Sequence, residues 1–244
     1  MLGNILRSLS SLIYGDGCII CGDHTQKGMH SICTKCRLEI PLTHFYSEED
    51  NPVKERFDGF VAVEQASAMF FYVTNSRWQG LVHRFKYSGK WQIAYSMGRW
   101  YGSLLKESGL YTDIDVIVPV PLHPIKILKR GYNQSEHIAI GVSRGLGVKY
   151  DFRAVRRVSN TASQALTQQS ERWRNMESVF KVRREQQLRG RHILIVDDVF
   201  TTGATTTSCI ESIITACQGD VRISVATLAV SRRLVEEMSD RYDV

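Results

Sequence analysis

The stretch that decides the fold runs from Ile193 to Thr205 and reads ILIVDDVFTTGAT. Its first four residues are β-branched or aliphatic, which predicts a strand buried on both faces, as in a parallel sheet. Two acids, Asp197 and Asp198, stand at the end of this strand, followed by hydroxyl residues and one glycine. Apolar side chains at helical spacing up to Cys217 then predict a helix. The predicted order is therefore strand, loop and helix.

The loop between this strand and this helix is suited to holding a phosphate. Unpaired backbone N–H groups and the positive end of the helix dipole converge at a helix N-terminus, and threonine hydroxyls add donors. Asp197 and Asp198 would repel a phosphate, so we expect them to accept hydrogen bonds from sugar hydroxyls or to hold Mg²⁺ with the substrate's oxygens. The alternative is an ordinary buried strand and a capped helix, but packing alone does not explain this acid pair and loop.

The motif resembles the phosphoribosyl pyrophosphate (PRPP) motif of type I phosphoribosyltransferases. The resemblance implies an α/β fold with a mostly parallel sheet flanked by helices. It also implies that Asp197 and Asp198 meet the ribose hydroxyls and that Mg²⁺ accompanies PRPP. The 5′-phosphate would be held by five consecutive loop residues, Thr201, Thr202, Gly203, Ala204 and Thr205.

Four cysteines near the N-terminus form two pairs with metal-binding spacing, Cys18 with Cys21 and Cys33 with Cys36. Two such pairs predict one tetrahedral Zn²⁺. Two disulfides are the alternative, but nothing in the sequence indicates export to an oxidising compartment. The segment between the pairs is too short and polar for a core of its own, so the metal would supply its folding energy.

The chain of 244 residues divides into three predicted parts. We expect an N-terminal helix and zinc knuckle over residues 1–45, an acidic linker over 46–58 and the phosphoribosyltransferase-like domain over 59–244. Within that domain, residues 59–73 predict two short strands in a hairpin at the edge of the sheet. We expect no transmembrane segment and no signal peptide, which favours a cytoplasmic location.

A second buried strand is predicted over residues 115–122, where two prolines end it. Cations follow this strand, and ligands bind at the carboxyl edge of an open α/β sheet. In the resembled family the loop at this place holds pyrophosphate. Arg130, with its forked donors, is the first candidate contact and Lys129 the second; for each, a solvated surface turn is the alternative. The basic turn over residues 86–90 is a further candidate for an anion contact.

Seven motifs in one order narrow the resemblance. They are the four-cysteine knuckle, FKYSG at 85–89, PVPL at 119–122, RGYNQ at 130–134, TxxQ at 161–164, RxxN at 172–175 and the acid-pair loop. The chain is similar over nearly its whole length to the ComF family of competence-associated phosphoribosyltransferase-like proteins. Tyr132 stands where phenylalanine is more usual. The resemblance implies a role in DNA uptake, with the uptake machinery as a partner, and a flexible hood at about residues 159–178 that closes over PRPP.

Basic residues concentrate in one part of the chain. Between His123 and Arg191 there are 15 Lys and Arg against 5 Asp and Glu, a surplus of ten, whereas the whole chain carries only +6. This stretch could attract single-stranded DNA by counterion release, with Tyr132 or Trp173 stacking on bases, or it could serve PRPP alone.

Three functions are consistent with these patterns. The first is an active phosphoribosyltransferase of nucleotide salvage. The second is a PRPP-binding protein of DNA uptake, and the third is a single-stranded DNA-binding module with a vestigial nucleotide pocket. We favour the second, a PRPP-binding protein of DNA uptake for which the sequence does not decide catalysis. The sequence carries no signature for a particular acceptor base.

Overall fold

A computed structural model describes residues 17–18, 20–23, 32–73, 76–87, 89–158, 179–232 and 235. These residues belong to two compact units, residues 1–41 and residues 42–244. The predicted N-terminal helix and the predicted hood at 159–178 lie outside the described residues.

The larger unit is built on a four-stranded parallel sheet, as predicted. The strands are β1 (Ala66–Tyr72), β2 (Val116–Pro119), β5 (Arg191–Phe200) and β6 (Val221–Ser231), in the spatial order β1-β6-β5-β2. Ile193 to Val196 are fully buried in β5, which lies inside the sheet between β6 and β2. The run of four aliphatic residues therefore occupies the position with helices on both faces, where no side chain meets water.

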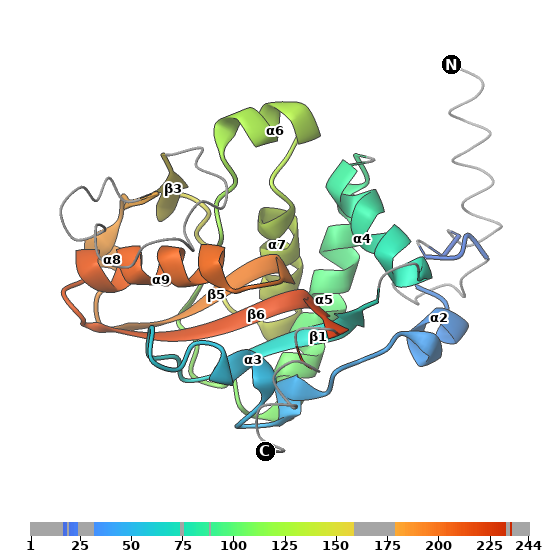
Figure 1. Cartoon of the computed structure of the whole chain (residues 1–244), viewed down its shortest axis with the longest axis horizontal. Helices are drawn as coiled ribbons and strands as arrows, with labels where there is room; N and C mark the ends of the chain where they lie inside the picture. The colour runs from blue at the N-terminus through green and yellow to red at the C-terminus, as the bar shows by residue number, and fades with distance from the viewer. Residues whose placement is uncertain are drawn as a thin grey trace. The chain divides into compact units, whose positions relative to one another are not determined.

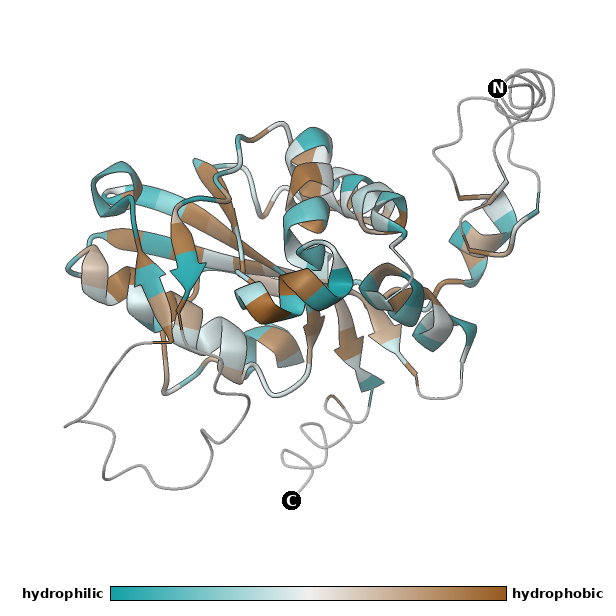
Figure 2. Cartoon of the chain, turned by 90° about the horizontal axis from the view of Figure 1, so that it is seen from above, coloured by the Kyte–Doolittle hydropathy of each residue, from teal (hydrophilic) through white to brown (hydrophobic). Residues whose placement is uncertain are grey.

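Helices cover both faces of the sheet (Figure 1). On one face lies α9 (Ala204–Ala216), whose Ile210 and Ile213 pack in one cluster with Ile193 and Ile195 of β5. On the other lie α5 (Trp91–Ser108) and α7 (Gln134–Leu146). The sheet is the most hydrophobic layer when coloured by hydropathy (Figure 2). Successive residues of a strand point to opposite faces, so β5 supplies both halves of the core.

Glycines allow α5 and α7 to approach each other closely. A Cβ atom added to Gly98 or Gly102 of α5 would overlap the backbone of Ile138 or Val142 in α7, and one added to Gly141 of α7 would overlap the backbone of α5. Interior glycines cost helix stability, so they are kept where backbones touch. This contact fixes the position of α7, whose first turn reaches the carboxyl end of β5.

The remaining elements are short helices, α4 and one small sheet. They are α2 (Thr34–Glu39), η1 (Phe45–Ser47), α3 (Pro52–Glu55), α4 (Arg77–Tyr87), α6 (Pro124–Arg130), α8 (Glu185–Leu188), and the antiparallel pair β3 (Val155–Arg157) and β4 (Phe180–Val182). The buried residues of α4 are Trp78, Leu81, Val82 and Phe85, which recur at the spacing of an amphipathic helix.

Two predictions for the first part of the domain are wrong. Residues 59–73 do not form a hairpin, because no strand forms over 59–65 and the one strand in this stretch, β1, pairs parallel to β6. Residues 46–58 are not a linker: they fold into η1 and α3, with Val53 and Phe57 buried. Asn51 is 2% exposed; its side-chain oxygen accepts from Val53 N and its amide donates to Ala66 O at 2.9 Å. Burial of the apolar side chains of Val53 and Phe57 stabilises this segment in the fold, although most of its neighbouring residues are acidic or polar.

Candidate functional site

The acid pair lies at the carboxyl edge of the sheet. Asp197 pairs with Thr227 of β6, and β5 continues to Phe200, so the acids are inside the last third of the strand and not after it. Both line a pocket of about 190 Å³ together with the whole loop from Thr201 to Thr205. The structure therefore brings the two halves of the predicted motif together around one cavity.

Asp197 is held by hydrogen bonds from three directions. Its Oδ1 accepts from Ser135 Oγ at 2.9 Å and from the backbone N–H of Asp198 at 2.8 Å, and its Oδ2 accepts from Thr206 Oγ1 at 3.3 Å. Burial, with repulsion from Asp198 as the second cause, raises the pKa of Asp197 to about 6, although these donors and Lys86 act in the opposite direction. This carboxylate is fixed in place and is costly to ionise.

Asp198 is neutralised by a lysine. The ammonium Nζ of Lys86, near the end of α4, lies 3.0 Å from Asp198 Oδ2, and the side chains are 21% and 15% exposed. The sequence pattern singled out the basic turn at 86–90 but not this partner, because 112 positions of chain separate the two residues. The sequence indicated Lys86 as part of a candidate anion contact, and only the tertiary structure reveals its pairing with Asp198.

The loop at 201–205 surrounds the N-terminus of α9. Gly203, with φ of 78°, is the N-cap of the helix, and Thr202 Oγ1 accepts from Ala204 N at 3.4 Å. The first residues of α9, from Ala204 to Thr206, line the cavity. An anion is favoured at a helix N-terminus by the backbone donors there and by the helix dipole. A Cβ atom on Gly203 would come within 2.9 Å of Phe200 Cζ, so glycine is required both by φ and by space.

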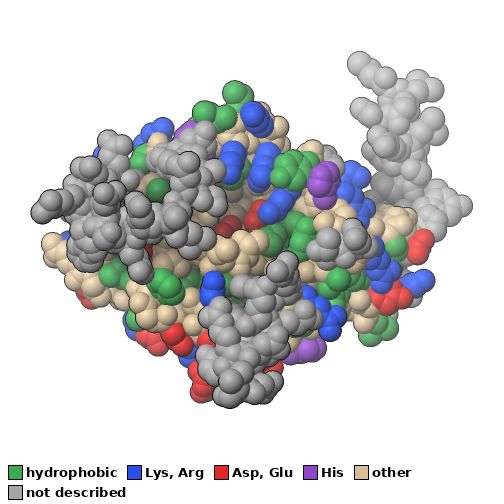
Figure 3. Space-filling model, viewed as in Figure 1, with side chains coloured by type: hydrophobic (Ala, Val, Ile, Leu, Met, Phe, Trp, Pro, Cys, Tyr) green, Lys and Arg blue, Asp and Glu red, His purple; other side chains and the backbone are tan. Residues whose placement is uncertain are grey.

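Cations from separate elements line the same cavity. They are Lys86 of α4, Lys126 and Arg130 of α6 and Arg157 of β3. Figure 3 shows blue side chains at the rim of a hollow that holds red carboxylates. Burial lowers the pKa of Lys126, and Arg157 and Arg130 lower it further by repulsion. This excess of positive charge at one cavity is typical of a site for a multiply charged anion.

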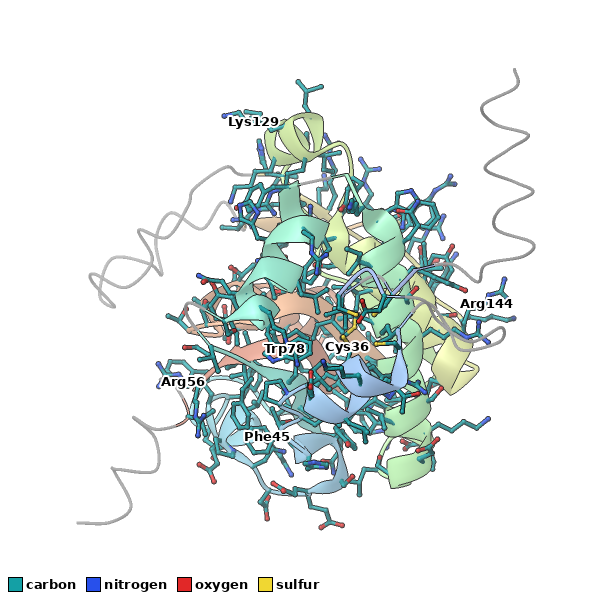
Figure 4. All side chains as sticks on the ribbon, turned by 90° about the vertical axis from the view of Figure 1, so that its right-hand side faces the viewer. Cys36, Phe45, Arg56, Trp78, Lys129 and Arg144 are labelled. Atoms are coloured by element: carbon teal, nitrogen blue, oxygen red, sulfur yellow. The ribbon has the colours of Figure 1, made fainter. Side chains whose placement is uncertain are left out.

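The two predicted pyrophosphate contacts differ in position. Arg130 lines the cavity; its guanidinium donates to Gln134 Oε1 at 3.1 Å and to Tyr87 OH at 3.3 Å, and it stacks 4.9 Å from the Tyr87 ring centroid. Lys129 is outside the set of residues that line the cavity and stands at the outer end of α6 (Figure 4). Arg157 was missed by sequence reasoning, since it follows no motif.

A second hollow adjoins the first and shares Lys86 and Thr201 with it. Its volume is about 690 Å³, and its other walls include Tyr72, Gln79 and His83. Gln79 donates to Tyr72 OH at 3.1 Å, and the rings of His83 and Tyr87 lie 4.8 Å apart. Aromatic walls with an amide suit a planar polar ligand.

The small unit gathers its four cysteines. The sulfur atoms of Cys18, Cys21, Cys33 and Cys36 all lie within 4.8 Å of one another, and Cys21 Sγ is 3.6 Å from Cys33 Sγ. Figure 4 shows these sulfurs beside Cys36. Tetrahedral zinc with bonds of about 2.3 Å separates its sulfurs by about 3.8 Å. The spacing fits four thiolates around one ion and none of the four forms a disulfide.

Backbone donors prepare one of these thiols for ionisation. Burial opposes the ionisation of Cys18, but hydrogen bonds from the backbone of Cys33, Cys21 and Ile20 outweigh it and lower the pKa to about 7. The N–H groups of Cys33 and Ile20 lie 3.3 and 3.4 Å from Cys18 Sγ. Such N–H donors to sulfur also orient metal ligands.

No helix among the described residues is long and apolar enough to cross a membrane. Cys209 and Cys217 are fully buried in the core.

The sequence is similar to one family model and to several known proteins. The phosphoribosyl transferase domain model matches residues 127–244. The DNA utilization protein YhgH of Escherichia coli K12 is 36% identical over 128 residues, which are 51% of this chain and 56% of that protein. Competence protein F of Haemophilus influenzae is 28% identical over 51% of this chain and 56% of its own length. Competence protein ComFC of Bacillus subtilis is 25% identical over 82% of this chain and 72% of its own. The matches thus span about half the length of the first two relatives.

Proposed function

We propose that this chain, a ComF-family phosphoribosyltransferase-like protein, binds PRPP in the β5–α9 cavity and serves in the uptake or use of external DNA. One observation carries the ligand: an acid pair, a phosphate-type loop and four cations line a single cavity. PRPP presents ribose hydroxyls, a 5′-phosphate and a pyrophosphate, one for each part. The biological role is supported by the names of the relatives.

Each part of the cavity takes one part of the ligand. The carboxylates of Asp197 and Asp198 accept hydrogen bonds from the ribose hydroxyls and supply the kind of oxygen ligands that Mg²⁺ prefers. The loop from Thr201 to Thr205 holds the 5′-phosphate at the N-terminus of α9. Arg130, Lys126 and Arg157 face the pyrophosphate, with Arg130 able to make a bidentate contact.

Calorimetric titration with PRPP and Mg²⁺ tests the assignment. The wild type should bind PRPP, and ribose 5-phosphate more weakly because it lacks the pyrophosphate. Asp197→Asn with Asp198→Asn should weaken PRPP binding at least about tenfold, since each hydrogen bond to a charged group is worth about 1.5–3 kcal/mol. Unchanged affinity in this variant would assign the acid pair a purely structural role.

Single-stranded DNA is the second proposed partner. Four cations of the small sheet and its flanks are exposed, and we call them the β3–β4 cationic surface: Arg153, Arg156, Lys181 and Arg183. Arg156 and Lys181 are direct cross-strand partners. Like charges placed opposite each other are unfavourable without a counter-charge, so this surface favours a polyanion.

Exposed aromatic rings accompany these cations. Tyr150 is 38% exposed and Phe152 is 44% exposed, with ring centroids 6.2 Å apart, and the Arg153 guanidinium lies 5.1 Å from the Phe152 ring. Rings beside cations suit stacking with bases. They replace Tyr132 as the stacking candidate, because the Tyr132 hydroxyl donates to Phe85 O and its ring is half-buried; Trp173 lies outside the described residues.

Transferase activity is a further candidate, supported by the second hollow. An acceptor bound between Tyr72, Gln79 and His83 would adjoin the PRPP cavity through Lys86 and Thr201. A screen of PRPP turnover against purine and pyrimidine bases, with and without single-stranded DNA, tests this candidate. Pyrophosphate release that requires one base supports it.

The cysteine cluster supports a structural zinc. The four sulfurs are within reach of one tetrahedral ion, and thiolate donors prefer zinc among the common hard and borderline cations. We propose that Zn²⁺ fixes the turn at Cys18 and the start of α2, where Cys36 N donates to Cys33 Sγ at 3.4 Å.

A further inference from the structure

Lys86 is anchored by its backbone carbonyl, and its side chain carries the ammonium on a long stem. The side-chain amide of Gln134 donates to Lys86 O at 3.2 Å, and Tyr132 OH donates to the preceding carbonyl, that of Phe85. These bonds tie the end of α4 to the loop that enters α7. The four-carbon stem of lysine keeps several rotamers available beyond such an anchor. The ammonium can therefore change partner while the backbone stays in place.

The Lys86 ammonium is paired with Asp198, one of the two acids that we propose to bind the ligand. Lys86 Nζ lies 3.0 Å from Asp198 Oδ2, in the cavity that also holds Asp197. Lys86 is the cation that contacts Asp198 among the described residues. The ion pair is largely shielded from water, so a second cation at the same oxygen would meet repulsion that solvent does not screen.

Lys86 borders two neighbouring cavities. It lines the adjoining hollow as well as the cavity. Around it, Lys126, Arg130 and Arg157 already crowd the cavity with positive charge, and repulsion from Lys86 contributes to the lowered pKa of Lys126. An ammonium in this position is stabilised by Asp198 or by an entering anion.

We propose that Lys86 is an exchangeable counter-cation of the acid pair. It holds Asp198 in the unliganded cavity, competes with a divalent cation for that carboxylate, and turns to a phosphate group of the ligand when the ligand enters. The competition with the metal stands on the ion pair alone. The turn to the phosphate rests on the proposed function.

Metal binding alone tests the competition. Mn²⁺, which reports its binding by electron paramagnetic resonance, is titrated into the full chain and its variants without PRPP. Lys86→Met removes the charge and keeps a similar length, and it should bind Mn²⁺ about tenfold more tightly than the wild type. Lys90→Met is the matched control, since Lys90 is exposed, lies four residues away and lines neither hollow. Its Mn²⁺ affinity should equal that of the wild type.

Two further variants locate the effect. Lys86→Arg keeps the charge and should keep the low Mn²⁺ affinity of the wild type. Adding Asp198→Asn to Lys86→Met should abolish the gain, because the oxygen in question is gone. Unchanged or weaker Mn²⁺ binding in Lys86→Met, with folding confirmed by circular dichroism, would overturn the proposal.

The ligand step has its own measurement. With saturating Mg²⁺, inorganic pyrophosphate should bind several-fold more weakly to Lys86→Met than to Lys90→Met. Equal affinities would overturn the turn to the phosphate. If the wild type and the variants differ in Mn²⁺ affinity as expected, but the wild type binds neither PRPP nor pyrophosphate, the proposed function fails and the counter-cation role of Lys86 stands.

Discussion

The hydroxyl of Ser135 donates to Asp197 Oδ1 at 2.9 Å and so joins the first turn of α7 to the carboxyl end of β5. Only 5% of Ser135 is exposed, and the accepting carboxylate lines the cavity. The side chain of Asn133 caps α7 by accepting from Ser135 N at 3.2 Å, which orients the serine. The start of a helix thereby supplies one of the donors that favour the ionised form of an acid on a strand, against the larger effect of burial.

This relationship gives PRPP binding a dependence on pH. The pKa of Asp197 is about 6, so the carboxylate is protonated as the pH falls below that value, and PRPP affinity should fall about tenfold between pH 7 and pH 5. Ser135→Ala removes a donor that favours the charged form, so it should move the midpoint to higher pH. Titrations of wild type and Ser135→Ala across this range check it. The same titrations with Asp197→Asn measure the pH dependence of affinity that comes from the ligand's own phosphates.

The raised pKa of Asp197 affects stability in the opposite direction to binding: ionisation favours PRPP affinity but opposes folding. A carboxyl whose folded pKa is raised above its unfolded value, here from 3.8 to about 6, opposes folding once it is ionised. The contribution of Asp197 to the free energy of unfolding should therefore decrease as the pH rises from about 4 to 6. Comparing denaturant unfolding of the wild type and Asp197→Asn at pH 4.5 and pH 7 isolates this contribution. A gain for the variant only at pH 7 is expected.

Gly203→Ala should remove phosphate binding. The added Cβ would press on Phe200 Cζ, and φ of 78° disfavours any side chain, so the loop must shift. Gly109→Ala is the matched control: φ is 76°, but a Cβ there meets no atom within 4 Å. Both variants should lose about 1 kcal/mol of stability, and only Gly203→Ala should lose affinity for ribose 5-phosphate in calorimetry. Equal affinity in the two would show that the loop does not hold the phosphate.

Cys33→Ser should release zinc and leave the larger unit folded. Three thiolates no longer complete the tetrahedral site, whereas the hydrophobic core cluster of the larger unit draws none of its described members from residues 1–41 and is kept. Elemental analysis and thermal unfolding measure the two effects. Cys209→Ser is the contrasting control, because Cys209 is buried in the core of the larger unit. It should lower the melting temperature with zinc unchanged. A full zinc content in Cys33→Ser would contradict a four-cysteine site.

Single-stranded DNA binding should weaken steeply with salt and depend on the β3–β4 cationic surface. Arg156→Ala with Lys181→Ala removes the cross-strand cations and should reduce the slope of log affinity against log salt by about 1.4, since each phosphate contact contributes about 0.7. Lys35→Ala with Lys106→Ala removes the same charge from exposed sites elsewhere and should leave the slope unchanged. Fluorescence anisotropy over a salt series gives the slopes. Equal slopes for the two double variants would exclude this surface.

Gly141→Ala should destabilise the fold by about 1–3 kcal/mol. The added methyl overlaps the backbone of α5, and overpacking between two helices forces them apart. Gly80→Ala is the control, since Gly80 is also inside a helix but a Cβ there meets no atom within 4 Å. That change should instead stabilise α4 by up to about 1 kcal/mol. Denaturant unfolding at pH 7 provides both values, and equal values would show that α5 and α7 tolerate a wider separation.

The sequence by itself determined the parts of this protein that depend on neighbouring residues. ILIVDDVFTTGAT predicts a buried strand, an acid pair and a helix start because period and turn chemistry act over a few residues, and β5, Gly203 and α9 occur there. The cysteine spacing predicted the cluster for the same reason. Local pattern failed at residues 46–58, where acidic composition concealed two core side chains, Val53 and Phe57.

Only the tertiary structure decided which distant residues complete the site. Ser135, Lys86 and Arg157 follow no common motif. They meet Asp197 and Asp198 because α7, α4 and the separate β3–β4 pair all pack at the carboxyl edge of β5. The close approach of α5 and α7 sets where Ser135 stands, and that approach depends on glycines whose partners lie in the other helix. Burial and the charges of neighbours then set the pKa of Asp197, and both are properties of the packed chain.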